Sequence, residues 1–174
     1  MSLQDIKNSI RNVPNFPKQG IQFKDITTAI KKPEILQEII DVLAQHFANA
    51  EIDYVAGIES RGFIFGVALA YKLGCGFVPV RKPNKLPAQK ISQEYALEYG
   101  TDKLEIHTDA LQKGDRVLVM DDLLATGGTA LAAAKLVQKT GAEVAAFAFV
   151  IELTNLCGEQ KLSPLGKVFS VIKY

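Results

Sequence analysis

The sequence predicts an α/β fold, with a single domain (residues 1–174) in which helices flank a mostly parallel, twisted sheet. Apolar runs of strand length alternate with stretches of helical periodicity, which is typical of parallel strands joined by crossover helices. The chain has 174 residues, a usual length for one domain. With 48% hydrophobic and 22% charged residues, it has the composition of a globular protein with a buried core.

Five apolar runs have the length and branched side chains of buried strands. In chain order they are Tyr54–Ile58, Gly76–Val80, Arg116–Met120, Val144–Ile151 and Lys167–Ile172. Three stretches have the 3.6-residue period of helices: Pro33–Phe47, Gly62–Leu73 and Ala130–Lys139. Pro33 stands in the first turn of its helix, where proline is tolerated, and Gly74 is placed as a C-cap of the second helix.

Two regions interrupt this alternation. Residues 11–28 contain Pro14, Pro17 and Gly20, and we expect them to be irregular and packed across an edge or a ligand. Residues 82–110 begin as a lysine-rich turn and then alternate polar and apolar residues, which predicts a mobile β-hairpin. A long excursion of this kind within one domain usually serves function.

Charge and composition favour a small-molecule ligand. The formal net charge is +1, so there is no general basic field for nucleic acid. No apolar run is long enough for a membrane span, and the first ten residues, "MSLQDIKNSI", lack the pattern of a secretion signal. Cys75 and Cys157 are too far apart in sequence to suggest a metal knuckle, and we expect reduced thiols in a cytoplasmic protein.

The segment "VLVMDDLLATGGTA" (residues 117–130) is the strongest functional signal. An apolar strand leads into Asp121 and Asp122, at the sheet edge where open α/β folds bind ligands. The small residues that follow let backbone N–H groups approach an anion, and the next helix directs its positive end at them. The sequence therefore predicts a phosphate-binding loop beside two acceptors for sugar hydroxyls. No G-x-x-x-x-G-K-[ST] motif is present, and no G-x-G-x-x-G opens a helix.

Cationic residues follow two other strands. "ESRGF" places Arg61 at the start of a helix, and "RKPNKLP" supplies Arg81, Lys82 and Lys85. Cations at two loops and an anion loop at a third indicate a ligand with phosphates at both ends. Each group also has a structural interpretation. The aspartates could cap a turn, the cations could be solvated, and His107 is better explained as a structural residue than as a catalytic one.

In these motifs the chain resembles the type I phosphoribosyltransferases, and among them those that act on adenine. The matching stretches are "FPKQGIQFKDIT", "ESRGFIFG", "FVPVRKPNKLP", "LEYGTDKLEIH" and "VLVMDDLLATGGT". The resemblance implies that adenine N9 displaces pyrophosphate from C1 of 5-phosphoribosyl 1-pyrophosphate, giving AMP in purine salvage. A transition state with oxocarbenium character would need stabilisation of leaving-group charge, removal of a proton from the base and exclusion of water.

The resemblance also implies roles for individual residues. The 5′-phosphate would be held by Ala125, Thr126, Gly127, Gly128 and Thr129, and the ribose hydroxyls would face Asp121 and Asp122. Arg61, Arg81, Lys82 and Lys85 would meet the pyrophosphate. Mg²⁺ would be bound mainly by the substrate, without a dedicated protein site. Adenine would stack on Phe23, with Gln22 and Lys24 beside it and Leu156 closing its other face.

The catalytic residues implied by the resemblance are Arg61 and Glu98. Glu98 would handle the proton of the purine on a hairpin that closes over the site. Residues 1–30 and 152–165 would form a small hood over the base. A homodimer is implied as well, because relatives place the basic loop after Val80 near a neighbouring subunit.

The sequence departs from the family pattern at two positions. Lys24 stands where many relatives have arginine, which leaves its contact open because the two cations differ in geometry. Asn84 replaces a frequent glycine, and because asparagine tolerates positive φ we expect the turn to be kept. Two alternatives remain at this stage: a regulator that binds the sugar pyrophosphate and nucleic acid without catalysis, and a transferase for a 6-oxopurine.

Overall fold

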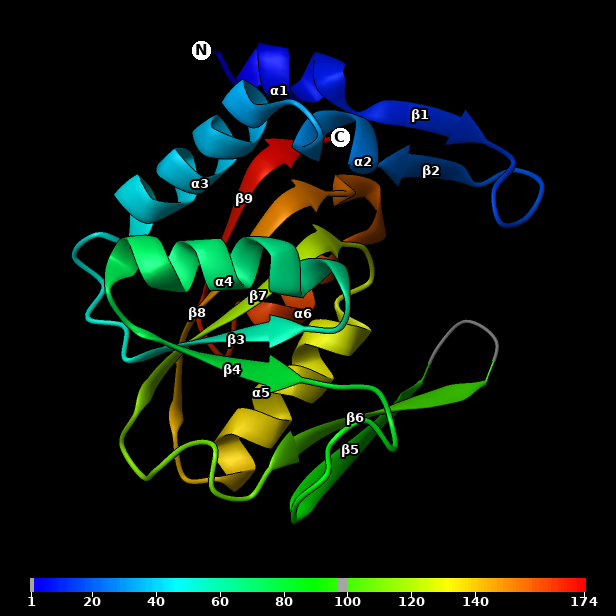
Figure 1. Ribbon diagram of the computed structural model, residues 1–174. Helices are drawn as coiled ribbons and strands as arrows, with labels where there is room; N and C mark the ends of the chain where they lie inside the picture. The colour runs from blue at the N-terminus through cyan, green and yellow to red at the C-terminus, as the bar shows by residue number, and fades with distance from the viewer. Residues whose placement is uncertain (1, 97–99) are drawn as a thin grey trace.

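The centre of the molecule is a five-stranded parallel sheet with strand order β4-β3-β7-β8-β9 (Figure 1). It is seen in a computed structural model that describes residues 2–96 and 100–174. The strands are β3 (Tyr54–Ile58), β4 (Gly76–Val80), β7 (Arg116–Leu124), β8 (Glu143–Glu152) and β9 (Lys167–Lys173). The predicted fold class is confirmed, and all five predicted strands are present.

Helices cover both faces of the sheet. α3 (Pro33–Phe47) and α4 (Arg61–Leu73) pack on one face together with α1 (Leu3–Ser9). α5 (Gly128–Lys139) and the short α6 (Gly158–Leu162) pack on the other. Each face therefore has its own hydrophobic core, as continuous apolar strands require. None of the helices in residues 2–96 and 100–174 combines the length and apolar character needed to cross a membrane.

Two glycines let α4 lie close to the sheet. A Cβ on Gly57 of β3 would be 2.6 Å from the Phe77 ring, and one on Gly66 of α4 would be 2.8 Å from the same ring. The Phe77 side chain therefore occupies the space that two missing side chains leave open. This packing fixes α4, and with it Arg61 at the helix start, against the carboxyl ends of β3 and β7.

The expectation that residues 11–28 are irregular is wrong. They contain an antiparallel hairpin of β1 (Arg11–Pro14) and β2 (Gln22–Asp25), followed by the short helix α2 (Thr27–Ile30). The prolines and Gly20 fall at the end of β1 and in the turn, where they do not interrupt the strand pairing.

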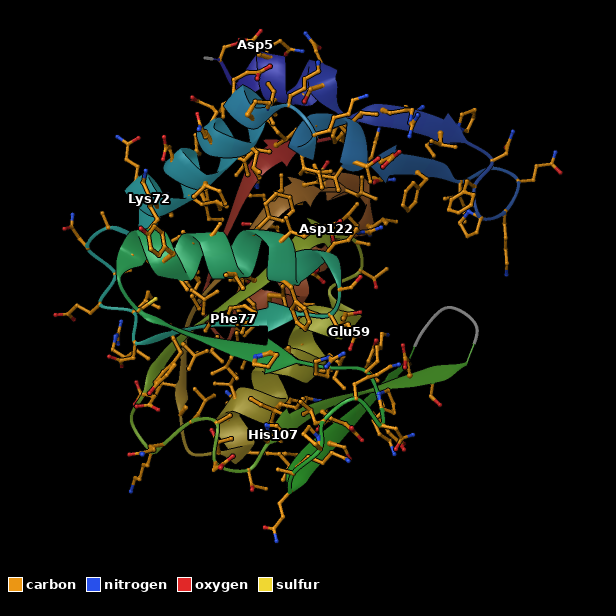
Figure 2. The ribbon with its side chains drawn as sticks, in the orientation of Figure 1. Asp5, Glu59, Lys72, Phe77, His107 and Asp122 are labelled. Carbon is orange, nitrogen blue, oxygen red and sulfur yellow. The ribbon has the colours of Figure 1, made fainter. Side chains whose placement is uncertain are left out.

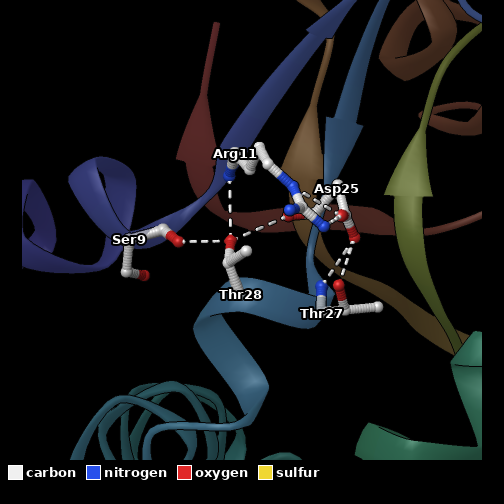
Figure 3. Close-up of polar contacts among 5 residues, drawn as sticks. All are labelled: Ser9, Arg11, Asp25, Thr27 and Thr28. Carbon is white, nitrogen blue, oxygen red and sulfur yellow. Dashed lines mark hydrogen bonds and ion pairs between the residues drawn. The ribbon is translucent and has the colours of Figure 1, made fainter.

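Polar contacts fasten this hairpin to α1 and α2 (Figure 3). Arg11 Nε donates to Asp25 Oδ2 at 3.0 Å, and Asp25 Oδ1 accepts from the N–H and hydroxyl of Thr27. Hydrogen bonds from Thr27, and then from Arg11, lower the pKa of Asp25 to about 2. Thr28 Oγ1 donates to Ser9 O at 2.7 Å and accepts from Arg11 N. A two-stranded hairpin is marginal by itself, so these contacts hold it in place.

A second hairpin, β5 (Lys90–Ala96) and β6 (Thr101–His107), confirms that residues 82–110 contain the predicted pair of strands. It packs beside α5, where Lys139 Nζ donates to Ser92 O at 2.9 Å. His107 Nε2 accepts a hydrogen bond from Ala88 N at 3.3 Å. Both hairpins extend past the carboxyl ends of β3 and β4, one on each side of the sheet edge (Figure 1).

Several element bounds differ from the prediction. β7 continues to Leu124 because Leu123 and Leu124 still pair with β8, so Asp121 and Asp122 lie within the strand and not after it. α4 begins at Arg61 and α5 at Gly128, earlier than their apolar periodicity indicated. Pro33 in the first turn of α3 and Gly74 as the C-cap of α4, with φ of 71°, are both confirmed.

Candidate active site

The loop between β7 and α5 lines a cavity of about 220 Å³ at the carboxyl edge of the sheet. Its lining includes Arg61 and the continuous run from Asp121 to Ala130. Gly127 has φ of +79°, a conformation that favours glycine, and it precedes the first turn of α5. The backbone N–H groups at this helix start have no intrahelical acceptors, so the loop is suited to binding an anion.

Close contacts between Gly158 and the loop also hold the loop in place. A Cβ on Gly158 would lie 2.3 Å from Ala125 O and 2.8 Å from Leu124 Cδ1, and one on Gly127 would lie 2.9 Å from Gly158 O. The backbone at the start of α6 therefore lies directly against the backbone of the loop between β7 and α5. This contact fixes the loop without any side chain between the two segments.

Asp121, Asp122 and Arg61 form a charged group beside the loop. Asp122 is almost fully buried, and its Oδ2 lies 2.6 Å from Arg61 Nε. Burial of the carboxyl and the neighbouring charge of Asp122 raise the pKa of Asp121 well above its ordinary value, and Arg61 partly opposes this. Gly62 makes the arrangement possible, because a Cβ there would be 2.7 Å from Met120 O and 3.1 Å from Asp121 Oδ1.

A larger cavity of about 480 Å³ adjoins the first and shares four of its residues, Arg61, Asp121, Asp122 and Thr129. Glu59 and Asp122, labelled in Figure 2, both line it. The remaining lining residues are Ser60, Lys82, Tyr95 and Asp102. A ligand that fills both cavities would pass between the β7–α5 loop, the paired carboxylates and the β5–β6 hairpin.

Lys82 is tied to that hairpin. Its Nζ donates to Asp102 Oδ2 and, at 3.1 Å, to the Tyr95 hydroxyl, which itself donates to Asp102 Oδ2 at 3.1 Å. Burial acts to lower the pKa of Lys82, but the hydrogen bonds that its ammonium donates to Asp102 and Tyr95 outweigh burial and raise the pKa above its ordinary value. Burial acts to raise the pKa of Asp102. Hydrogen bonds outweigh this effect, the one from Lys82 most of all, and the pKa of Asp102 is lowered below its ordinary value.

Arg81 and Lys85 do not line either cavity. Arg81 Nε donates to Glu59 Oε2 at 2.9 Å, and Arg81 Nη1 donates to Lys85 O at 3.3 Å. The hydrogen bond from Arg81 lowers the pKa of Glu59. Of the four cations predicted to meet a pyrophosphate, the structure therefore brings Arg61 and Lys82 together at the cavity and leaves Arg81 and Lys85 in the adjoining loop. Asn84 in this loop has φ of +64°, so the tolerance predicted for it is confirmed.

The predicted base-binding residues lie on the first hairpin and across from it. The Phe23 ring is 5.5 Å from Arg61 Cζ and meets the Phe16 ring edge-on at 5.2 Å. Gln22 Oε1 accepts from Asn12 Nδ2 at 2.7 Å. Leu156 lies on a 3-10 turn, Thr154–Leu156, and its side chain is partly exposed. Phe23 is thus beside the guanidinium that also lines both cavities.

Some residues of the site were not anticipated, and one prediction falls outside the described part of the chain. Tyr95 and Asp102 were missed, although they are direct partners in the β5–β6 register and the alternation of the hairpin could have placed them on one face. Glu59 was noted within "ESRGF" but was given no role. Glu98 lies in 97–99, outside the described residues.

The sequence matches the family described as "Phosphoribosyl transferase domain" over residues 27–171. The adenine phosphoribosyltransferase of Chlorobium luteolum is 58% identical over 172 residues, which is 97% of each chain. That of Chloroflexus aurantiacus is 57% identical over 174 residues, the whole of both chains. The chain belongs to the adenine phosphoribosyltransferase family.

Solved structures of the family have the same fold as this chain. The adenine phosphoribosyltransferase of Thermoanaerobacter pseudethanolicus superposes with a TM-score of 0.96 at 52% identity, covering 99% of this chain and 100% of that one. The Saccharomyces cerevisiae enzyme, solved with adenine and an imino-altritol bisphosphate, gives 0.93 at 42% identity over 98% of both chains. The family resemblance drawn from the sequence motifs is therefore confirmed over the whole chain.

Proposed function

We infer that the chain transfers the 5-phosphoribosyl group from 5-phosphoribosyl 1-pyrophosphate to adenine, giving AMP and pyrophosphate in purine salvage. Its relatives, nearly 60% identical over the full length, support this activity. The structural observation that supports it is the pair of adjoining cavities, which are lined by the loop between β7 and α5, by Asp121 and Asp122, and by Arg61.

We propose that the sugar pyrophosphate spans both cavities. The 5′-phosphate would lie in the loop from Ala125 to Thr129, where the start of α5 and the loop hydroxyls can neutralise it. The ribose hydroxyls would donate to Asp121 and Asp122 near the shared boundary. The pyrophosphate would then reach Arg61 and Lys82 in the larger cavity. Arg61 would stay close to Asp122, whereas Lys82 would exchange Asp102 for the pyrophosphate.

Mg²⁺ would enter this site bound mainly to the substrate. Within residues 2–96 and 100–174 no three His, Cys, Asp or Glu side chains are grouped to hold a metal ion. Asp122 is engaged by Arg61, so protein oxygens alone would give few ligands. The pyrophosphate and sugar hydroxyls would supply the remainder, as hard divalent cations prefer. When bound, the ion would neutralise charge that develops on the leaving pyrophosphate.

Adenine would bind against the first hairpin. Its ring would stack on Phe23, backbone groups near Gln22 would read its edge, and Leu156 would close the opposite side. Residues 1–30 and 152–165 would together form the hood over the base. Glu98, on the segment between β5 and β6, would accept the N9 proton or serve N7 as the hairpin closes and excludes water.

A direct assay tests the activity. The protein would be incubated with Mg²⁺, 5-phosphoribosyl 1-pyrophosphate and one of adenine, hypoxanthine or guanine, and nucleotide formation would be followed. We expect AMP from adenine and far slower product with the two 6-oxopurines. Preference for a 6-oxopurine would overturn the assignment of the base. Absence of any product, together with a gel shift of nucleic acid at moderate salt, would favour a regulator instead.

Phe23→Ala is expected to raise the KM for adenine roughly 5- to 150-fold, because stacking of a base on an aromatic ring contributes about 1–3 kcal/mol. The KM for the sugar pyrophosphate should change much less. Phe16→Ala is the matched control, since Phe16 touches Phe23 but its ring is half exposed. Equal increases in both KM values for Phe23→Ala would show that Phe23 is a packing residue.

We also propose that the chain forms a homodimer, and α4 presents a surface suited to one. Ile64, Val67 and Tyr71 share one face of this helix and are 42%, 51% and 88% exposed. An apolar stripe of this kind on the surface commonly marks an interface. A second copy of the chain is the proposed partner for this face, because the family resemblance implies an adjacent subunit near the loop from Arg81 to Lys85.

Light scattering at assay concentration should give twice the mass of one 19.0 kDa chain. Replacing Val67 and Tyr71 together by Asp should lower the mass to that of a monomer, because two charges would be buried in the contact. Leu3→Asp, at an exposed apolar residue on α1, is the control and should leave the dimer intact. An active monomer of the unmodified chain would contradict the proposal.

A further inference from the structure

Tyr174 links two segments of the proposed base-binding hood. Its ring lies under two ammonium groups, with Lys24 Nζ 4.0 Å and Lys7 Nζ 4.5 Å from the ring centroid. Its hydroxyl donates to Lys7 O at 3.2 Å. One aromatic side chain therefore contacts both α1 and β2, which come from the first 30 residues of the chain.

The backbone of Tyr174 is fastened to the opposite side of the hood. Tyr174 N donates to Glu152 O at 2.9 Å at the end of β8. Tyr174 O accepts from Thr154 N at 3.0 Å and from Thr154 Oγ1 at 2.6 Å. The residue is thus held by the sheet and by the turn that carries Leu156, and burial raises the pKa of its hydroxyl.

Lys24 transmits this attachment to the base-binding strand. Successive side chains of a strand point to opposite faces, so Lys24 and Phe23 lie on opposite sides of β2. Lys24 meets the Tyr174 ring, whereas Phe23 meets Arg61. The contacts of Arg11, Asp25 and Thr28 fix the base of the hairpin, and the Lys24–Tyr174 contact fixes its middle.

We propose that Tyr174 is a positioning residue for adenine: by holding the Lys24 ammonium against its ring, it sets the depth at which Phe23 stands over the base site. The proposal rests on the placement of adenine against Phe23. It also gives Lys24 a contact of its own: the ammonium sits on an aromatic face, a contact that a neutral side chain of similar length could not make.

The first experiment compares Tyr174→Leu with Tyr174→Phe. Loss of a cation–π contact should raise the KM for adenine roughly 2- to 30-fold in the leucine variant. The phenylalanine variant keeps the ring and should stay within about twofold of the unmodified protein. The KM for the sugar pyrophosphate should change little in both. Adenine KM values that are unchanged in Tyr174→Leu, or raised equally in both variants, would overturn the proposal.

A double-mutant cycle separates positioning from direct binding by Lys24. If Lys24 acts through the ring, Lys24→Met and Tyr174→Leu should each raise the adenine KM, and the double variant should be no worse than the more impaired single variant. Additive effects would mean that Lys24 acts on the base independently of Tyr174, which would overturn the proposal. Lys7→Met removes the other ammonium from the same ring but lies on α1, and it should leave the adenine KM unchanged.

The outcomes distinguish this inference from the proposed function. If Phe23→Ala leaves the adenine KM unchanged, the placement of the base is wrong. If Phe23→Ala raises it and Tyr174→Leu does not, only the role of Tyr174 is wrong. Should Tyr174→Leu fail to fold, the comparison of Lys24→Met with Lys7→Met decides, because equal effects of these two variants on the adenine KM would reject the link through β2.

Discussion

Glu98→Gln is expected to slow single-turnover formation of AMP by roughly 10²–10⁴-fold while changing either KM modestly. This is the usual contribution of a positioned acid–base group, or about 3–5 kcal/mol of activation free energy. Glutamine preserves size and hydrogen bonding but cannot exchange a proton, so the substitution isolates the chemical step. Rapid quenching is the appropriate measurement, because slow product release could conceal the defect in steady-state kcat.

Glu94→Gln is the matched control for that experiment. Glu94 lies on β5 of the same hairpin, and its carboxylate is 3.4 Å from Lys103 Nζ. Most of its side chain is exposed, so loss of this pair should leave the single-turnover rate nearly unchanged. If Glu98→Gln formed AMP in a single turnover as fast as the unmodified protein, the purine would exchange its proton elsewhere and Glu98 would only help to cover the site.

Gly158→Ala should impair both stability and binding of the sugar pyrophosphate. The new Cβ would lie 2.3 Å from Ala125 O, so the backbone of α6 or of the β7–α5 loop must move. Overpacking of this kind costs about 1–3 kcal/mol, which corresponds to a fall in Tm of roughly 2–12 °C for a domain of this size. Loss of one charge-assisted phosphate contact would raise the KM for the sugar pyrophosphate about 10- to 150-fold.

Gly166→Ala provides the comparison for Gly158→Ala. A Cβ on Gly166 would make only ordinary contacts, at 3.5 Å from Ala146 Cα and Val144 O. Both Tm and the KM for the sugar pyrophosphate should therefore stay close to those of the unmodified protein. If Gly158→Ala matched this control in both measurements, the loop would not depend on the backbone contact with Gly158.

The parts of the fold that follow from local patterns were predictable. Buried parallel strands are continuous apolar runs, and α3 has both the helical period and proline in its first turn, so their residues identify them. Asn84 could be assigned a turn because asparagine tolerates the observed positive φ. The β5–β6 hairpin was likewise visible in the alternation of its residues.

Other features depend on contacts that no local pattern contains. The β1–β2 hairpin has strands of four residues, too short for a periodic signal, and it is held by contacts with α1 and α2. The ion pair of Arg61 with Asp122 joins two motifs that are distant in sequence. α1 was a different case: Ser2 and Asp5 form a capping box whose spacing could have indicated the helix start.

Lys82 would couple the β5–β6 hairpin to the bound substrate, because both would contact its ammonium. Its ammonium is shared by one hairpin carboxylate and one tyrosine hydroxyl, and in the proposed complex a pyrophosphate oxygen would compete for the same charge. Attachment of Lys82 to the hairpin and binding of pyrophosphate to Lys82 would then be linked equilibria, and the coupling between them is reciprocal. In that complex, a tighter attachment of the hairpin to Lys82 would weaken binding of the pyrophosphate, and departure of pyrophosphate would return the ammonium to Asp102 and Tyr95. Substrate occupancy and hairpin attachment would thereby be two readouts of a single competition for one positive charge.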